Sequence, residues 1–314
     1  MMKNKTKNRP THFESEVFHR RTKRESDRFA IPLLILCLGL ITLMGCSDIS
    51  EKKSEVESSQ VAALETESKL ESEKGVYLEK MELPESNGDL SSDMIGVVVY
   101  QGAVYLQAEY LTGDNEVKQA LIGEYLGETI DSIDEWSKQD KYSQEFASNM
   151  AGAVHTVNGY DSSFRICIQS PNTPDNDIWL YENINGITLT TGEDLYGTRL
   201  HLKDNYQEVL GQSHDDWDNG RNNYKTIDLS EETIAKFVDI LYTSAFEDLS
   251  QEPESLYEIH QEQAHLYFKM KDSTSVHLRL FENGYVGYGN SPTGQAFVKI
   301  SNPMFSEIFQ AVMA

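Results

Sequence analysis

Positive charge is scarce outside the first 45 residues of this chain. The 314 residues include 27 Lys and Arg against 51 Asp and Glu, a net charge of −24. The first 45 residues hold nine of the basic and four of the acidic residues, so residues 46–314 carry 18 against 47, a net charge of −29. A surface this acidic repels nucleic-acid phosphates and anionic lipid headgroups. The composition therefore excludes nucleic-acid binding and argues against adhesion by charge to anionic wall polymers.

Recognisable catalytic motifs are also lacking. The sequence contains no HExxH, no GxSxG, no glycine-rich phosphate loop and no Cys–His signature. Acidic residues are so abundant that a pair of carboxylates carries no information about glycosidase chemistry. We therefore expect a protein without a catalytic centre, cofactor or metal. An enzyme that acts on wall or peptide substrates is the alternative.

A surplus of positive charge precedes an apolar run near the amino terminus. The run from Phe29 to Gly45 is 17 residues long, contains no charged residue, and ends beside Cys46 in the order Leu-Met-Gly-Cys. A basic leader tends to stay in the cytoplasm, and 17 residues is the lower limit for a spanning helix and workable for a signal peptide. This arrangement resembles the lipobox of bacterial lipoprotein precursors. In that family the cysteine receives a diacylglyceryl group and the chain is cut just before it.

The lipobox resemblance implies where the protein works. It makes Cys46 the lipidation site, residues 1–45 a signal peptide, and the remainder a lipid-anchored protein on the extracytoplasmic side of the cell membrane. An uncleaved membrane anchor over residues 29–45 is the alternative. Both readings place residues 47–314 on the outer side of the membrane.

Intrachain disulfide bonds are not expected to stabilise the mature protein. The chain has three cysteines, Cys37, Cys46 and Cys167. If the first leaves with the signal peptide and the second carries lipid, Cys167 stands alone and no intrachain disulfide forms. Side chains alternate along the predicted strand over residues 164–168, so Cys167 is expected on the side opposite to Ile166 and Ile168. We expect a buried small side chain here and not a reactive nucleophile.

The body of the chain divides by composition into a tether and two ordered blocks. Ser and Glu fill 20 of the 46 positions from 47 to 92, and large apolar residues are sparse there. We expect residues 46–92 to be the lipidated cysteine and a disordered tether. Residues 93–170 read as a β-rich domain. Residues 178–314 read as an α+β domain with an antiparallel sheet and packed helices, so the expected fold class is α+β.

Turn and cap signals locate the expected elements. Hairpins are predicted over residues 95–107, 153–168, 179–189 and 264–281, each around a polar or glycine-containing turn. Residues 121–130 are ambiguous, but their glycines favour a strand. Ser230 or Asp228 caps a predicted amphipathic helix, and Pro303 opens a last one after Ser301 or Asn302.

A second resemblance rests on short strand and turn pieces of the first block. These pieces are Val99 to Gly102, Ile122 to Glu124, Leu126 to Glu128, Val157 to Asp161 and Phe164 to Ile166. They resemble a group of uncharacterised lipoproteins of Gram-positive bacteria. That group supports the location and carries no catalytic assignment. The expected role is binding, sensing or assembly at the cell envelope, with the membrane as one partner and a protein or cell-wall component as another.

One acidic segment is a candidate for calcium. Residues 213–220 read SHDDWDNG, and side-chain oxygens of Asp215, Asp216, Asp218 and Asn219 are weak candidate ligands. The match to a calcium loop fails because Trp217 occupies a ligand position and Thr226 stands where a bidentate Glu belongs. We interpret the segment as a solvated acidic loop with Trp217 packed beneath it.

Histidines and tyrosines supply the remaining candidates. His265 and His277 are expected on paired strands, where they could share a metal if they lie opposite each other. Two histidines without a carboxylate or thiolate are not a site, so ordinary strand histidines are the favoured interpretation. Several tyrosines near glycine-containing turns could stack on glycans or peptides, but packing is favoured; they are Tyr181, Tyr196, Tyr285 and Tyr288.

Overall fold

The computed structural model describes residues 75–81, 96–112, 115–131, 133, 144–171, 177–249, 262–291 and 296–314. All of them belong to one compact unit, Glu71–Ala314. The lipidation candidate Cys46, the apolar run before it and most of the predicted tether lie outside the described residues. Within the described ranges, no helix combines the length and the apolar character needed to cross a membrane.

The first sheet has eight strands in the order β4-β7-β8-β9-β3-β2-β6-β5. Its strands are β2 (Val97–Tyr100), β3 (Ala103–Leu111), β4 (Ile122–Glu128), β5 (Ile130–Asp131), β6 (Ala147–Ser148), β7 (Ala153–Val157), β8 (Arg165–Gln169) and β9 (Ile178–Glu182). The strands at the two edges, β4 and β5, are separated only by Thr129. The backbone of Thr129 bonds to Gly152 beside β7, and Ile130 bonds to Phe146 beside β6. The sheet therefore closes on itself.

Alternation along β7, β8 and β9 gives this sheet two buried sides. Ile166 and Ile168 pack with Val154 and Tyr181 on one side. Cys167 packs on the other side with Leu180 and other apolar residues. The predicted orientation of Cys167 is confirmed. The strand prediction over residues 121–130 also holds for β4, which follows the short helix α2 (Asn115–Leu121).

The second sheet has seven antiparallel strands in the order β12-β11-β14-β15-β16-β17-β13. They are β11 (Tyr206–Ser213), β12 (Lys225–Thr226), β13 (Phe246–Asp248), β14 (Gln263–Met270), β15 (Ser275–Phe281), β16 (Tyr285–Tyr288) and β17 (Ala296–Lys299). The predicted hairpin over residues 264–281 is β14–β15. Every other residue of these two strands, among them Leu266, Phe268 and Leu278, enters the main core.

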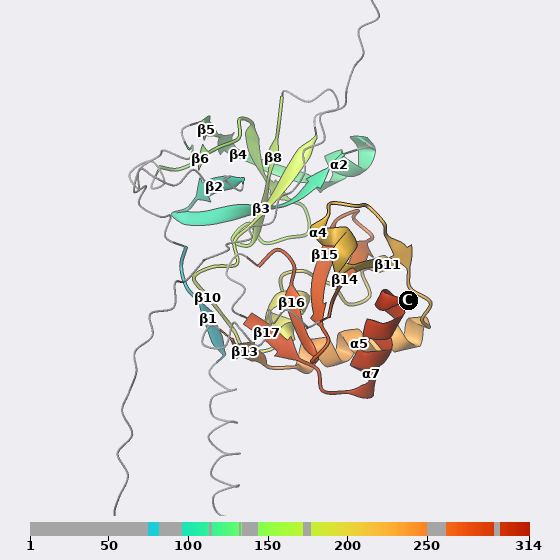
Figure 1. Cartoon of the computed structure of the whole chain (residues 1–314). Helices are drawn as coiled ribbons and strands as arrows, with labels where there is room; N and C mark the ends of the chain where they lie inside the picture. Colours follow the sequence, from blue (N-terminus) through green and yellow to red (C-terminus); the bar gives the residue numbers. More distant parts are fainter. Residues whose placement is uncertain are drawn as a thin grey trace, which may run out of the picture. The chain divides into compact units, whose positions relative to one another are not determined.

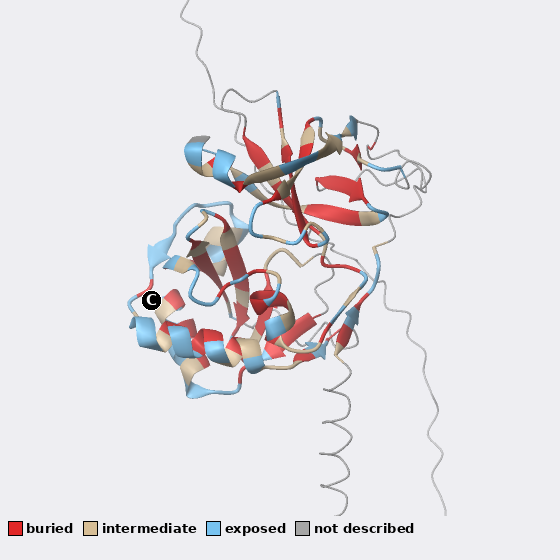
Figure 2. Ribbon diagram, turned by 180° about the vertical axis from the view of Figure 1, so that it is seen from behind, coloured by how far each residue is buried: buried red, intermediate tan, exposed pale blue. Residues whose placement is uncertain are grey.

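Two helices cover one side of this sheet. The Ser230 side chain accepts from Thr233 N and caps α5 (Glu231–Thr243), and Asn302 caps α7 (Pro303–Met313) in the same way. Both caps match the sequence prediction. The apolar stripes of the two helices include Phe237 on α5 and Ile308 on α7, both of which are fully buried. Figure 1 shows α5 and α7 together against the sheet, and Figure 2 shows the exposed outer side of α5 beside its buried inner side.

Part of the predicted tether is a strand of the fold. β1 (Val76–Leu78) pairs antiparallel with β10 (Ile187–Leu189). Val76 and Leu78 are buried in the main core and Tyr77 points outward, 57% exposed. The prediction of a disordered tether over 46–92 is therefore wrong at this strand. Three residues with two apolar side chains are too short a signal against a Ser- and Glu-rich background.

The boundary between the two predicted blocks also needs correction. β9 falls inside the predicted second domain (178–314), yet it pairs with β8 and β3 of the first sheet. The predicted hairpin over 179–189 is wrong for the same reason, because β10 pairs with β1. The π-helix η1 (Glu193–Gly197) and α4 (His214–Asp218) complete the described elements. The fold is α+β, as the sequence predicts.

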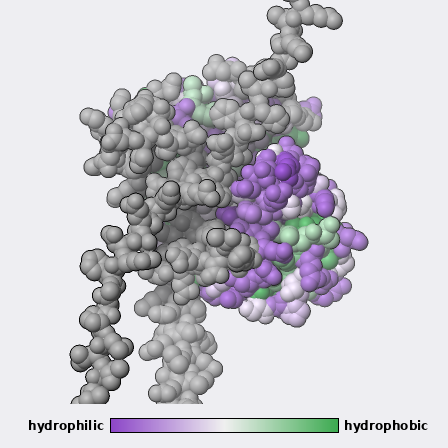
Figure 3. Space-filling model, viewed as in Figure 1, coloured by the Kyte–Doolittle hydropathy of each residue, from purple (hydrophilic) through white to green (hydrophobic). Residues whose placement is uncertain are grey.

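The main core joins residues of both sheets. It contains Phe164 beside β8 and Ile184 after β9 together with the second sheet and its helices. On the face seen in Figure 3, the described residues are mostly hydrophilic, with hydrophobic residues between them. This distribution agrees with the acidic composition.

Candidate functional site

The β14–β15 hairpin brings two histidines to the side of the second sheet that α5 and α7 do not cover. Its register pairs Tyr267 with His277 and His265 with Arg279. Since side chains alternate along a strand, these four residues share one side, while Leu266 and Leu278 face the main core. The two histidines are therefore diagonal neighbours. They lie on paired strands, as predicted, but not opposite each other.

Three imidazoles form a hydrogen-bonded series on this side of the sheet. His214 Nδ1 lies 3.0 Å from His265 Nε2. His265 Nδ1 lies 2.8 Å from His277 Nε2. We call His214, His265 and His277 the histidine chain. His265 is completely buried, His277 is 9% exposed, and His214 is half-buried at the outer end of the series.

The helix α4 supplies the outer end of the histidine chain. Ser213 caps it by accepting from Asp216 N, which fixes the helix directly after β11. His214 and Trp217 are three residues apart and so lie on the same side of the helix. The Trp217 ring stacks on His265 with centroids 4.5 Å apart and planes 15° from parallel. The segment predicted as a solvated acidic loop is thus a helix that packs its aromatic residues on the sheet.

The inner end of the chain is equally enclosed. The Tyr267 ring stacks on His277 at 4.3 Å with planes 7° apart. A Cβ atom at Gly289 would lie 2.0 Å from His277 Nδ1, so the backbone after β16 approaches this ring as only glycine allows. The Tyr267 hydroxyl donates to Gln212 Oε1 at 3.0 Å. The hydrogen bond to Gln212 thus restricts the Tyr267 ring, and the Tyr267 ring restricts the His277 ring.

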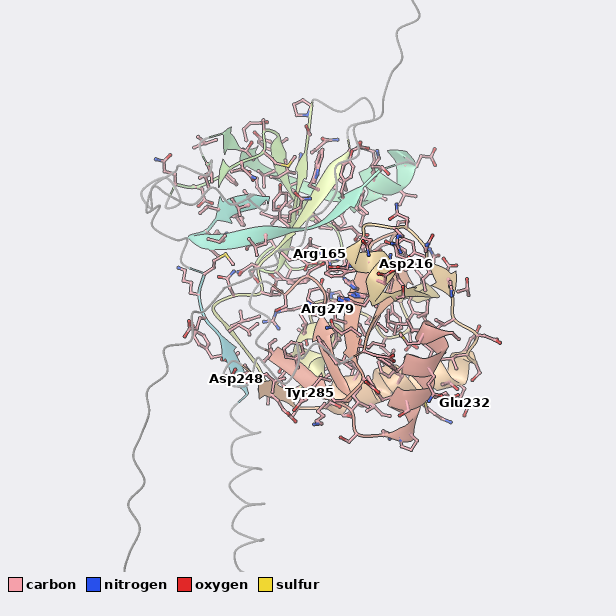
Figure 4. All side chains as sticks on the ribbon, in the orientation of Figure 1. Arg165, Asp216, Glu232, Asp248, Arg279 and Tyr285 are labelled. Atoms are coloured by element: carbon pink, nitrogen blue, oxygen red, sulfur yellow. The ribbon has the colours of Figure 1, made fainter. Side chains whose placement is uncertain are left out.

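Burial and a nearby cation keep the inner imidazoles neutral. Burial lowers the pKa of His277 to about 3, with a further contribution from the positive charge of Arg279. Burial also lowers the pKa of His265 well below its usual range, helped by His277, Arg279 and His214. Both rings are therefore uncharged at neutral pH. Figure 4 labels Arg279 and also Asp216 of α4.

The arrangement is a hydrogen-bonded series of imidazoles and does not have the geometry of a metal centre. Both nitrogens of His265 are used by different neighbours, so the three rings do not converge on a common point. Among the described residues, no group of three or more His, Cys, Asp or Glu side chains could hold a metal ion. The weak calcium candidates have other partners, since Asp215 and Asp216 both bind Arg221 at 2.7 and 3.2 Å. Asn219 donates to Asp215, and Asp218 is exposed.

A second polar cluster lies where the two sheets meet. Arg165 Nε donates to Glu182 Oε1 at 3.1 Å, and the Tyr288 hydroxyl donates to Glu182 Oε2 at 2.8 Å. The guanidinium carbon lies 4.1 Å from the centre of the Tyr160 ring. We call Arg165, Glu182, Tyr160 and Tyr288 the inter-sheet cluster. Arg165 is only 1% exposed, and its Nη1 has no hydrogen-bond partner in the described structure.

The remaining sequence candidates are structural. Cys167 is buried, and burial raises the pKa of its thiol to about 12, so the reactive thiolate is not formed at neutral pH. Tyr181, Tyr196 and Tyr288 are buried, as the packing interpretation predicts, and Tyr285 packs against Phe297. Comparison of the chain with protein-family models, with curated proteins and with solved structures finds no match.

Sequence reasoning missed the third histidine and the aromatic stack. The turn after Met270 predicts the β14–β15 register, and that register alone places His265 and Tyr267 beside His277. His214 joins through β11, which is paired with β14 but lies about 50 residues earlier in the chain. The available local signal was the capped segment Ser213 to Asp218, which reads as a short helix as readily as a loop.

Proposed function

We propose that this chain is a lipid-anchored extracytoplasmic protein that works by binding, sensing or assembly at the cell envelope and not by catalysis. The location rests on the lipobox-type order of residues 43–46 after a basic leader and an apolar run. Two acyl chains on Cys46 give stable attachment, whereas a single chain is reversible. The acidic body, with a net charge of −29 after residue 45, favours a neutral or basic partner over an anionic one.

One observation supports the non-catalytic role best. The histidine chain brings three titratable side chains together on the second sheet, and it is closed. Its inner nitrogens bond to one another, and Trp217 and Tyr267 cover its rings. A general base must reach a substrate proton within hydrogen-bond distance. Buried, mutually bonded imidazoles suit a sensing or structural role.

The anchor is tested with the full chain in its host membrane. We expect the wild-type protein to begin at Cys46, to incorporate an alkyne-labelled fatty acid and to sediment with membranes. Cys46→Ser should lose the label and the new amino terminus, while Cys37→Ser and Cys167→Ser should keep both. Unlabelled wild-type protein that retains residues 29–45 and still sediments with membranes would establish the uncleaved anchor.

The enzyme alternative is tested separately. Purified full-length protein in detergent is incubated with cell-wall preparations and with a peptide library, and released fragments are measured by mass spectrometry. We expect no release above that from a heat-denatured sample. Time-dependent release that is lost in His265→Gln, with the fold retained by circular dichroism, would establish an envelope enzyme.

A further inference from the structure

We propose that the histidine chain is an acid-sensitive latch that holds α4 on the second sheet and releases it when the chain takes up more than one proton. This inference concerns the protein as it folds and does not depend on lipidation. It rests on the order of the hydrogen bonds, on what covers the rings, and on the charges around them.

The hydrogen-bond pattern sets the proton capacity of the closed state. A neutral imidazole has one donor and one acceptor nitrogen. His265 can therefore bond to both neighbours only when the tautomers of the three rings run in one direction, from His214 to His277 or the reverse. One added proton is compatible with both bonds wherever it sits, because the other rings can adjust their tautomers. A second proton forces two N–H groups to face each other.

In the open state, in which α4 has left the second sheet, this limit on the number of bound protons does not apply. When α4 leaves the sheet, His214 and His265 become solvated, have ordinary pKa values of about 6.5 and bind two protons. His277 stays covered by the Tyr267 ring and the backbone at Gly289. The closed chain holds none or one proton, so opening takes up at least one proton in mildly acidic solution. By linkage, the ratio of open to closed molecules then rises at least about 10-fold for each unit that the pH falls below this range.

The charged groups around the histidine chain make its protonation less favourable but do not prevent it. The charged and titratable groups on the elements around the chain are Glu208 of β11, Tyr267 and Lys269 of β14, Arg279 of β15, Asp215, Asp216 and Asp218 of α4, Arg221 and Tyr224 of the segment after α4, and Glu109 of β3. Arg279 is a fixed positive charge near His265 and His277 and lowers the pKa of both. Asp215 and Asp216 of α4 bind Arg221 and thus form ion pairs already.

The part that moves is α4, because its attachment is small. It has five residues, and none of them is buried. Trp217 and His214 both stack on His265 of the histidine chain. The Trp217 ring also lies 5.4 Å from the guanidinium carbon of Arg279. The β14–β15 strands are held by a full ladder and by the main core on their other side. Repulsion in the chain therefore displaces the helix and exposes Trp217 and the face of His265.

Two single-tryptophan versions of the full chain in detergent test the latch. One keeps Trp217 and the other keeps Trp179, a residue of the first sheet, with the remaining tryptophans changed to Phe. We expect Trp217 fluorescence to change between pH 6.5 and 4.5 with a pH dependence that corresponds to the uptake of at least one proton. Trp179 fluorescence should stay constant over the same range. A constant Trp217 signal, or a change of both signals together, would overturn the proposal.

A matched pair of substitutions identifies the groups that titrate. His214→Asn keeps a donor or acceptor near the position of Nδ1 but cannot bind a proton. The number of protons taken up on opening should therefore fall by one. His155→Asn, in the first sheet, should leave that number unchanged. If His214→Asn does not fold, ¹⁵N spectra of the wild-type imidazoles decide. We expect His265 in one neutral tautomer at pH 7.4, and independent titration of all three rings near pH 6.5 would contradict the latch.

Discussion

Among the described residues, Arg165 is one of the largest fully buried side chains, and Glu182 is the carboxylate at hydrogen-bond distance from it. Removing one member of a buried ion pair leaves the other charge without compensation and without water. The inter-sheet cluster thus makes the stability of the protein depend on a single carboxylate. Its Tyr160 ring and the Tyr288 hydroxyl complete the enclosure.

The first prediction concerns this pair. Arg165→Met should lower the free energy of unfolding by about 3–5 kcal/mol, because Glu182 is left buried and unpaired. The double substitution Arg165→Met with Glu182→Met should recover most of that loss. Lys203→Met, which breaks an exposed ion pair with Asp239, is the control and should cost less than about 1 kcal/mol. Denaturant unfolding of the four proteins measures these values, and a double variant as unstable as the single one would contradict the prediction.

The second prediction concerns the pH dependence of stability through Glu109. Burial raises the pKa of this carboxyl, although Ser275 N donates to it at 2.9 Å. The folded protein therefore binds this proton more tightly than the unfolded chain. The resulting stability is complete below about pH 4.5 and is lost as pH rises through the folded pKa.

Glu109→Gln keeps an oxygen acceptor for Ser275 and removes the titration. We expect the variant to gain stability relative to wild type as the pH is raised from 4.5 to 7.5. Exposed Glu124→Gln serves as the control. Denaturant midpoints across this pH range give the answer, and a difference from wild type that does not change with pH would show that Glu109 is not perturbed by the fold.

At the scale of elements, β1 shows how a short strand can be essential while its sequence signal is weak. Only three residues pair with β10, yet Leu78 is 1% exposed and belongs to the main core. The third prediction is that Leu78→Ala lowers the free energy of unfolding by about 2–5 kcal/mol, the usual cost of a core cavity. Tyr77→Ala, on the exposed side of the same strand, should cost much less. Equal effects would mean that β1 is not packed on the core.

Sequence reasoning recovers the elements whose partners are close along the chain. The β7–β8 and β14–β15 hairpins follow from turn residues, and the α5 and α7 boundaries follow from Ser230 and Asn302 as caps. It fails where pairing is distant. β9 joins β3 across about 70 residues, and no local pattern indicates which sheet an apolar strand enters. Sequence reasoning placed His265 and His277 on paired strands, but it did not bring in His214, because that residue lies on α4 after the distant strand β11.

At the scale of the whole molecule, the two sheets should unfold together. Residues beside the first sheet share the main core with the second sheet, and residues 71–314 form one compact unit. The fourth prediction is a single thermal transition of the full chain, with the same midpoint for Trp179 and Trp217 fluorescence. Chelator should leave that midpoint unchanged because Asp215 and Asp216 bind Arg221. Two separated transitions would show that the shared core does not couple the sheets.

The position of β1 also has a mechanical consequence. If the protein is tethered through its amino-terminal side, as we propose, a pulling force reaches this strand before either larger sheet. The load is then carried by three residue pairs and the side chains of Val76 and Leu78. Detaching the strand breaks these pairs and passes the load to β2, the next paired strand along the described chain. We therefore expect β1 to yield before the larger sheets are strained.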